Sequence, residues 1–235
     1  TALRFDPAPA QLEPGKAVYR LSLAPSETRS LFIEIGCDAN GAEDPPSRLF
    51  FRSLRDARRA LRRSSSRAAT VQSSNEIFNE TMRRSVSDLY MLMTDTEEGP
   101  YPYAGVPWFS TVFGRDALIT AREMLWLDPA VARGVLLHLA ANQATEFDPH
   151  TDAEPGKILH EVRYGEMAET GEVPFRRYYG SVDSTPLFVM LAGAYFERTG
   201  NREVLETLWP HVRAALDWIE TYGDRDGDGF VEYGR

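Results

Sequence analysis

The stretch YAGVPWFSTVFGRDALIT, residues 103–120, changes character halfway along its length. Its first half is rich in glycine, proline and aromatic residues, which is typical of a loop. Its second half has the apolar spacing of a helix, and its first charged residues are Arg115 and Asp116. Such a pair either complements the helix dipole or forms the floor of a binding pocket. The rest of the chain decides between these interpretations.

Helical spacing continues on both sides of this stretch. A capping-box pattern at Ser73 and Glu76 precedes apolar residues at steps of three and four, which predicts an amphipathic helix. Further helices are predicted over residues 114–127, 129–144, 184–198 and 202–222. A long stretch without periodicity, residues 147–183, is rich in aromatic and charged side chains, so we expect a functional loop. Long helices with alternating short and long links suit an α/α toroid, whose long loops gather at one end.

The N-terminal region has a different period. Residues 18–23 and 31–35 alternate apolar and polar side chains, and the turn-like APSET between them predicts a β-hairpin. So few strands cannot bury a core alone. Residues 37–47 read as a linker because they are rich in Asp, Gly, Asn and Pro.

Composition limits the classes of protein. The chain has 235 residues, 43% of them hydrophobic, and a net charge of −9, which argues against nucleic acid as a partner. The arginines between residues 48 and 67 recur at helical spacing, which favours a solvated helix face over a specific anion site. Cys37 is the single cysteine, so a disulfide framework is not expected. With no leader or membrane span evident, the simplest expectation is a cytoplasmic protein without membrane contact.

Four segments carry a resemblance to a known family. They are PWFSTVFGRDALIT, GKILHEVRYGE, RYYGSVDSTPLFVMLAGAYFERTGN and DRDGDGFVEY. In this order and spacing they resemble the amylo-α-1,6-glucosidase and glycogen debranching enzyme family over about residues 70–235. These inverting glycosidases, related to glucoamylase and trehalase, pair a β-sandwich with an (α/α)6 barrel.

The resemblance implies a mainly α fold with part of an (α/α)6 toroid. Residues 1–38 would be the C-terminal remnant of a β-sandwich domain, 39–72 a linker and linker helix, and 73–235 the first half of the barrel. The implied activity is hydrolysis of α-linked glucose at branch or chain ends. The implied partner is glycogen or an α-glucan oligosaccharide, and no cofactor is expected.

Sugar recognition is assigned first to the Arg-Asp pair. A carboxylate accepting from vicinal hydroxyls and a guanidinium donating to their oxygens would fix a terminal glucose. The resemblance gives that role to Arg115 and Asp116. The alternative is that the pair only stabilises the helix start and its neighbours. Nearby aromatic rings favour the sugar site because sugar C–H faces pack on them, and we expect Trp108 and Tyr103 to take this role.

Asp183 is the candidate general acid, because it stands where the resembling enzymes carry their catalytic aspartate. An inverting glycosidase needs this acid and a second carboxylate that activates water. The alternative is an N-cap, since Asp before Ser-Thr-Pro is well suited to start a helix. Glu161 is the second candidate for the acid and Glu166 a weaker third. His160 and Tyr179 are candidate substrate-binding residues in the long loop.

The DRDGDGF segment at residues 224–230 has two interpretations. Asp224, Asp226 and Asp228 match positions of a calcium loop, but its twelfth position is Arg235 where a glutamate is needed. The same residues are also typical of a tight turn. We therefore predict no metal site here, and calcium remains only a weak candidate ligand of this loop. By resemblance, Glu232 would lie near the sugar.

The resemblance also implies that the chain is one piece of an enzyme. The general base of the family would lie beyond residue 235, so we expect this piece alone to be inactive. Uncovered apolar helix faces would favour self-association. Two alternatives remain: a related toroid glycosidase, such as a trehalase or a glucosyl- or mannosylglycerate hydrolase, and a non-catalytic carbohydrate-binding helical module.

Overall fold

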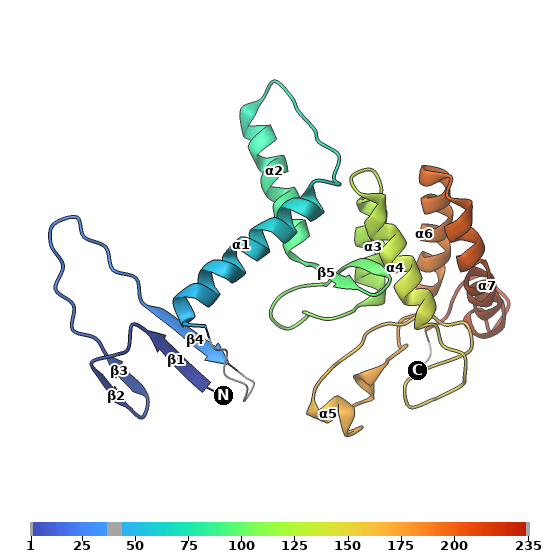
Figure 1. Ribbon diagram of the computed structural model, residues 1–235. Helices are drawn as coiled ribbons and strands as arrows, with labels where there is room; N and C mark the ends of the chain where they lie inside the picture. Colours follow the sequence, from blue (N-terminus) through green and yellow to red (C-terminus); the bar gives the residue numbers. More distant parts are fainter. Residues whose placement is uncertain (1, 37–43, 234–235) are drawn as a thin grey trace. The chain divides into compact units, whose positions relative to one another are not determined.

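The computed structural model of the chain describes residues 2–36 and 44–233. Within them the fold is mainly α with some β, comprising seven α-helices and six short strands that pair into three sheets (Figure 1). The chain divides into two compact units, Thr1–Arg63 and Ser64–Arg235. Cys37 and Arg235 lie outside the described residues. No helix in the described part of the chain has both the length and the apolar composition needed to cross a membrane.

The first unit contains a strand pair whose partners lie far apart in the sequence. Strand β1 (Ala2–Asp6) pairs antiparallel with β4 (Phe32–Gly36). Arg4 lies directly opposite Glu34 in this register, and the two form an ion pair. Cross-strand pairs of this kind stabilise a sheet and fix its register.

The predicted hairpin between residues 18–23 and 31–35 is wrong. Residues 19–31 contain no strand, and a shorter hairpin of β2 (Gln11–Glu13) and β3 (Lys16–Val18) ends before them. The second predicted strand does form as β4, but it pairs with β1. The reason is that β1 offers a matching alternation of apolar and polar side chains along its whole length.

Helix α1 (Pro46–Ser65) carries the arginine-rich stretch. Its start is tied to the preceding turn, because Arg48 pairs with Asp44 at 3.1 Å. The ring of Phe50 lies 5.4 Å from the ring of Phe32 on β4, so the helix packs on the sheet of its own unit. Most other side chains of α1 are exposed.

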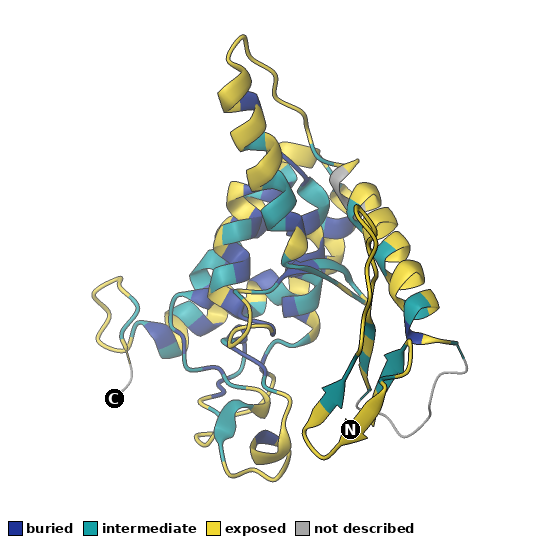
Figure 2. Cartoon of the chain, turned by 90° about the vertical axis from the view of Figure 1, so that its left-hand side faces the viewer, coloured by how far each residue is buried: buried dark blue, intermediate teal, exposed yellow. Residues whose placement is uncertain are grey.

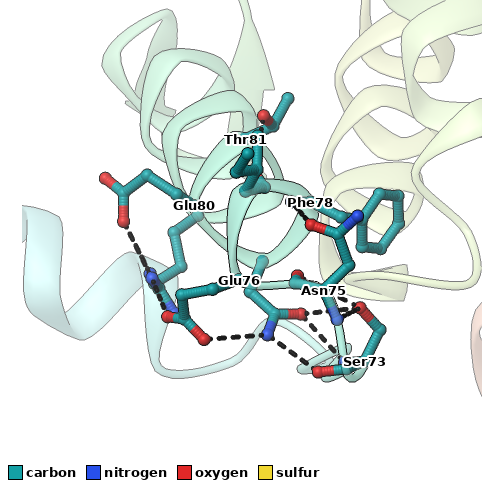
Figure 3. A network of polar contacts seen from close by, with 9 residues as sticks. Ser73, Asn75, Glu76, Phe78, Glu80 and Thr81 are labelled. Carbon is teal, nitrogen blue, oxygen red and sulfur yellow. Dashed lines mark hydrogen bonds and ion pairs between the residues drawn. The ribbon is translucent and has the colours of Figure 1, made fainter.

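The second unit contains the predicted amphipathic helix, α2 (Glu76–Met91), but its cap differs from the prediction (Figure 3). The capping box that begins at Ser73 is wrong, because Asn75 is the N-cap and its Oδ1 accepts from the Phe78 N–H at 3.1 Å. Ser73 instead donates its N–H to Asn79 Oδ1 at 2.8 Å. Asparagine is as good a cap as serine, and it stands directly before the helix.

A short hairpin, β5 (Met93–Thr96) and β6 (Gly99–Pro102), packs against α4 (Pro129–Ala141). Gly134 allows the close approach, since a methyl group there would overlap the carbonyl oxygen of Pro100. Small residues at such crossings let a helix and a strand approach at backbone distance.

The remaining helices of this unit are α3 (Gly114–Glu123), α6 (Ser184–Thr199) and α7 (Arg202–Trp218), which continues into a π-helical turn, Ile219–Gly223. The helices predicted after residue 73 are therefore confirmed, with their C-terminal ends shifted. Helix α3 packs against both α4 and α6, and α6 packs against α7 (Figure 1).

The core of the second unit lies between these helices (Figure 2). Its largest fully buried side chains include Leu118, Leu136, Phe188, Leu208 and Trp218. The packing is that of helix faces with apolar residues at steps of three and four.

Asp128 is a buried polar residue at the start of α4. Its Oδ1 accepts from the Ala130 N–H at 3.1 Å, and its Oδ2 accepts from the Tyr90 hydroxyl at 2.7 Å and from Arg67 Nε at 3.3 Å. One carboxylate therefore caps α4 and ties it to α2.

The long loop predicted over residues 147–183 is confirmed as largely irregular. It contains only the short helix α5 (Glu166–Glu169) and a 3₁₀ turn, Pro174–Arg176. A backbone bridge between Glu161 and Tyr178 closes the loop on itself. The loop connects α4 to α6, so it leads from the C-terminal side of α4 to the N-terminus of α6.

Candidate functional site

The start of α3 is held against the long loop by close backbone contact. The Gly114 N–H donates to the carbonyl oxygen of His160 at 2.7 Å. A methyl group on Gly114 would overlap the carbonyl oxygen of Leu159, so the approach requires glycine. A second bridge joins Phe113 to Glu161. The aromatic loop and the GKILHEVRYGE stretch therefore meet at the N-terminus of α3.

Asp183 occupies the N-cap position of α6, yet its side chain makes no capping hydrogen bond. The Ser181 hydroxyl accepts from the Ser184 N–H at 3.3 Å instead. Asp183 Oδ2 accepts from Arg115 at 3.4 Å, and the two side chains are 41% and 47% exposed. The structure thus brings Arg115 and Asp183 together, and the capping alternative for Asp183 is not realised.

His160 lies in the middle of the site. Its ring contacts those of Phe113 and Tyr178 edge to face, with centroids 6.0 and 5.9 Å apart. Its buried Nδ1 has no hydrogen-bond partner in the described part of the chain. Burial lowers the pKa of His160, and the charges of Arg115, Glu161, Asp116 and Asp183 act on it. The imidazole is therefore neutral at neutral pH and retains hydrogen-bonding capacity for a ligand.

Glu161 is buried and held by a residue that the sequence analysis did not single out. Its Oε2 accepts from Arg163 Nε at 2.8 Å, and Arg163 also donates to the carbonyl oxygen of Trp108 at 2.8 Å. The Arg163 guanidinium lies 5.1 Å from the Phe113 ring centroid. Arg163 thus connects the aromatic loop to Glu161. The available signal was the i, i+2 spacing of Glu161 and Arg163, which places both side chains on one side of an extended segment.

Asp116 makes no ion pair with Arg115 among the described residues, although its charge acts on His160. With Tyr103 it lines a separate cavity of about 230 Å³ between α2, the β-hairpin and α3. The other residues lining this cavity are mostly apolar, among them Leu89 and Ile119. Arg115 thus contacts Asp183 while Asp116 lines this cavity, because adjacent helix residues point about 100° apart, and the sugar-binding role of the pair stays a prediction.

The other candidates are dispersed. Trp108 is 79% exposed on the aromatic loop, where its ring is accessible. Tyr179 is buried and donates its hydroxyl to the Asn142 carbonyl oxygen at 2.8 Å. Glu166 is exposed at the first position of α5. Of these, only Trp108 has a direct link to the site, through Arg163.

The acidic loop after α7 forms a cluster of its own. Asp224, Asp226, Asp228 and Glu232 have carboxylate oxygens within 4.8 Å of one another, so these four could hold a cation. Glu232 Oε2 accepts from the Arg225 N–H at 2.6 Å. Glu232 supplies the further carboxylate that the calcium-loop spacing lacked. It therefore belongs with the aspartates of its own loop.

Neither a known protein family nor a curated protein matches this chain. The chemistry of the site is accordingly inferred from its groups. A carboxylate, a guanidinium, a neutral imidazole and an accessible indole lie around the N-termini of α3 and α6. This set offers donors, acceptors and an aromatic face, which suits a ligand rich in hydroxyl groups.

Proposed function

We propose that the chain is the sugar-binding, acid-bearing part of an inverting glycoside hydrolase that acts on α-linked glucose, similar to amylo-α-1,6-glucosidase. The observation that carries the proposal is the pairing of Arg115 with Asp183 at 3.4 Å, across 68 residues of sequence. Both residues come from motifs that carry the family resemblance. In this proposal α2 to α7 form the first half of an (α/α)6 toroid.

Each group has a role in the proposed reaction. Asp183 protonates the oxygen of the leaving group, while Arg115 and the unpartnered Nδ1 of His160 bind sugar hydroxyls. Trp108 packs on a sugar ring, and Arg163 holds its loop in place. The resemblance places the general base in later helices, so this chain would supply only the acid half of the machinery.

A second candidate function is a carbohydrate-binding module without turnover. It is favoured by the 41% exposure of Asp183 and by its guanidinium neighbour, because general acids of glycosidases stand in apolar pockets or beside a second carboxylate. In this alternative Asp183 accepts hydrogen bonds from sugar hydroxyls. The surrounding residues keep the roles given above.

The test measures turnover of α-1,6-branched glucosides by a protein that contains this chain, with the product anomer followed by proton NMR. We expect β-glucose, and a loss of about two orders of magnitude or more for Asp183→Asn. Arg115→Ala should weaken sugar binding by about tenfold. Arg122→Ala and Asp217→Asn serve as matched controls, since both residues are exposed and stand near the C-terminal ends of α3 and α7.

The possible results separate the candidates. Sugar binding that depends on Arg115 without any turnover would favour the binding module. A product of α configuration would exclude the inverting mechanism. Full activity in both site variants would refute the proposed assignment of Asp183 and Arg115.

A further inference from the structure

A second cavity, of about 700 Å³, lies between the C-terminal end of α4 and the long loop. Its lining includes Thr145 and Glu146, which follow α4, and Tyr164 and Arg177 of the long loop. Pockets that bind small molecules measure roughly 300–1,000 Å³, so this cavity is large enough for a short oligosaccharide. No residue of the Arg115–Asp183 pair lines it.

The wall between the cavity and the proposed catalytic site is the bridged segment of the long loop. Val162 and Tyr179 line the cavity, whereas the neighbouring Glu161 binds Arg163 on the catalytic side. The Tyr179 hydroxyl is fixed to the carbonyl oxygen of Asn142 at 2.8 Å. The cavity is therefore separated from the Arg115–Asp183 pair by a loop segment that hydrogen bonds hold in position.

Several polar groups that line the cavity are already satisfied within the fold. Gln143 donates to the carbonyl oxygens of Gly156 and His211 and so serves the packing of α4. Asp148 accepts from the Thr151 hydroxyl at 2.8 Å. These groups line the cavity, but their hydrogen bonds are already made to other groups of the protein.

Three lining side chains keep their binding capacity. Within the described residues, Glu146 and Arg177 make no side-chain hydrogen bond or ion pair, and the Tyr164 side chain is 75% exposed. Both charged side chains are exposed, so each is hydrated and can exchange its water for hydrogen bonds to a ligand. Together they offer an acceptor, donors and an aromatic face.

The charges of Glu146 and Arg177 indicate which chemical class of ligand the cavity suits. One free carboxylate and one free guanidinium cancel, which disfavours a polyanion or a cation, and the polar lining disfavours an apolar ligand. A neutral ligand that both donates and accepts hydrogen bonds fits, and hydroxyl groups do both. We propose that this cavity is a second saccharide-binding site, which takes a short oligosaccharide apart from the catalytic site. The choice of an α-glucan as that oligosaccharide rests on the proposed function.

The experiment titrates the ¹⁵N-labelled chain with maltotriose and follows backbone amide shifts. We expect shifts at Thr145, Glu146 and Arg177 that persist in Arg115→Ala, because the two sites do not share residues. Arg177→Met should weaken this binding by about tenfold, since it removes a charged hydrogen-bond donor. Tyr164→Ala is a second test that removes only the aromatic face.

Matched controls are Arg198→Met and Glu197→Gln, which change exposed residues on α6. An equal effect of Arg198→Met and Arg177→Met would overturn the cavity site. Shifts confined to residues around Arg115 and His160 would also overturn it while supporting the proposed function. Shifts confined to the cavity would support the second site and count against the first.

Two further results complete the test. Equal binding of cellotriose, a β-linked trisaccharide, would keep the saccharide site and overturn its assignment to α-glucan. The absence of amide shifts with both sugars would overturn the second site. The proposed function would then be tested by the turnover of branched glucosides alone.

Discussion

Replacing Gly114 with alanine tests whether the close approach of α3 to the long loop positions the site. Alanine is normally the better helix residue, by about 1 kcal/mol over glycine. At Gly114, however, the new methyl group would overlap the Leu159 carbonyl oxygen and lie 3.3 Å from Ser184 Oγ. The obstacle is backbone, and the Gly114 N–H is bound to the His160 carbonyl oxygen at 2.7 Å, so neither segment moves freely.

The expected effect of Gly114→Ala is therefore a loss of stability. Overpacking of this kind costs about 1–3 kcal/mol, and the clash with a fixed carbonyl favours the upper part of that range. A net loss of about 2 kcal/mol lowers the melting temperature by roughly 4–8 °C for a chain of this size. The same displacement would move Arg115 relative to Asp183, so the proposed sugar binding should weaken as well.

Urea unfolding followed by circular dichroism measures the free energy of unfolding directly. Gly193→Ala is the matched control, because Gly193 lies inside α6 and a methyl group there meets nothing within 4 Å. That variant should gain up to about 1 kcal/mol. If Gly114→Ala were as stable as the wild type, or gained stability as Gly193→Ala should, the close approach would not be a constraint on the site.

Three more substitutions have expected outcomes. Glu154→Gln should cost about 1–3 kcal/mol of unfolding free energy, because it removes one of the two carboxylates, those of Glu154 and Asp152, that lie 3.5 Å from the buried Lys157 ammonium; an unchanged urea midpoint would contradict this. Asp128→Ala should cost about 2–4 kcal/mol by removing the cap of α4 and the acceptor of the buried Tyr90 hydroxyl, and a loss below 1 kcal/mol would refute that account. Burial lowers the pKa of His160 below 6.5, so the unfolded chain binds a proton that the folded chain does not, and stability should fall as pH drops below 6.5. His160→Gln should flatten that decline in unfolding measured between about pH 7.5 and 5.5, and an unaltered slope would exclude His160 as its source.

Helix existence was predictable because apolar spacing reflects which face of each helix is buried. The spacing behind Phe78 located α2, but the cap moved from Ser73 to Asn75, since caps depend on which side chain reaches a free amide. The predicted strand pairing was wrong for a similar reason. Alternation of apolar and polar residues identifies a strand, but cross-strand contacts determine its partner, and β4 pairs with β1.

The candidate site was predictable only where sequence motifs marked it. Arg115 and Asp183 come from two such motifs, and the fold brings them together at the N-termini of neighbouring helices. Arg163 was not found, because its role depends on the carbonyl oxygen of Trp108, which lies 55 residues away. The different surroundings of Arg115 and Asp116 were not predictable, because adjacent helix residues point about 100° apart and their contacts depend on how the helix packs.

The two ion pairs of the site differ in a way that bears on ligand binding. The Arg115–Asp183 pair is nearly half exposed on both sides, and pairs of that kind contribute about 0–1 kcal/mol. The Glu161 and Arg163 side chains are 10% and 34% exposed, and Arg163 is also fixed to the Trp108 carbonyl oxygen. A hydroxyl-rich ligand can therefore separate the first pair at little cost and use both of its partners, while the second pair continues to hold the aromatic loop in position.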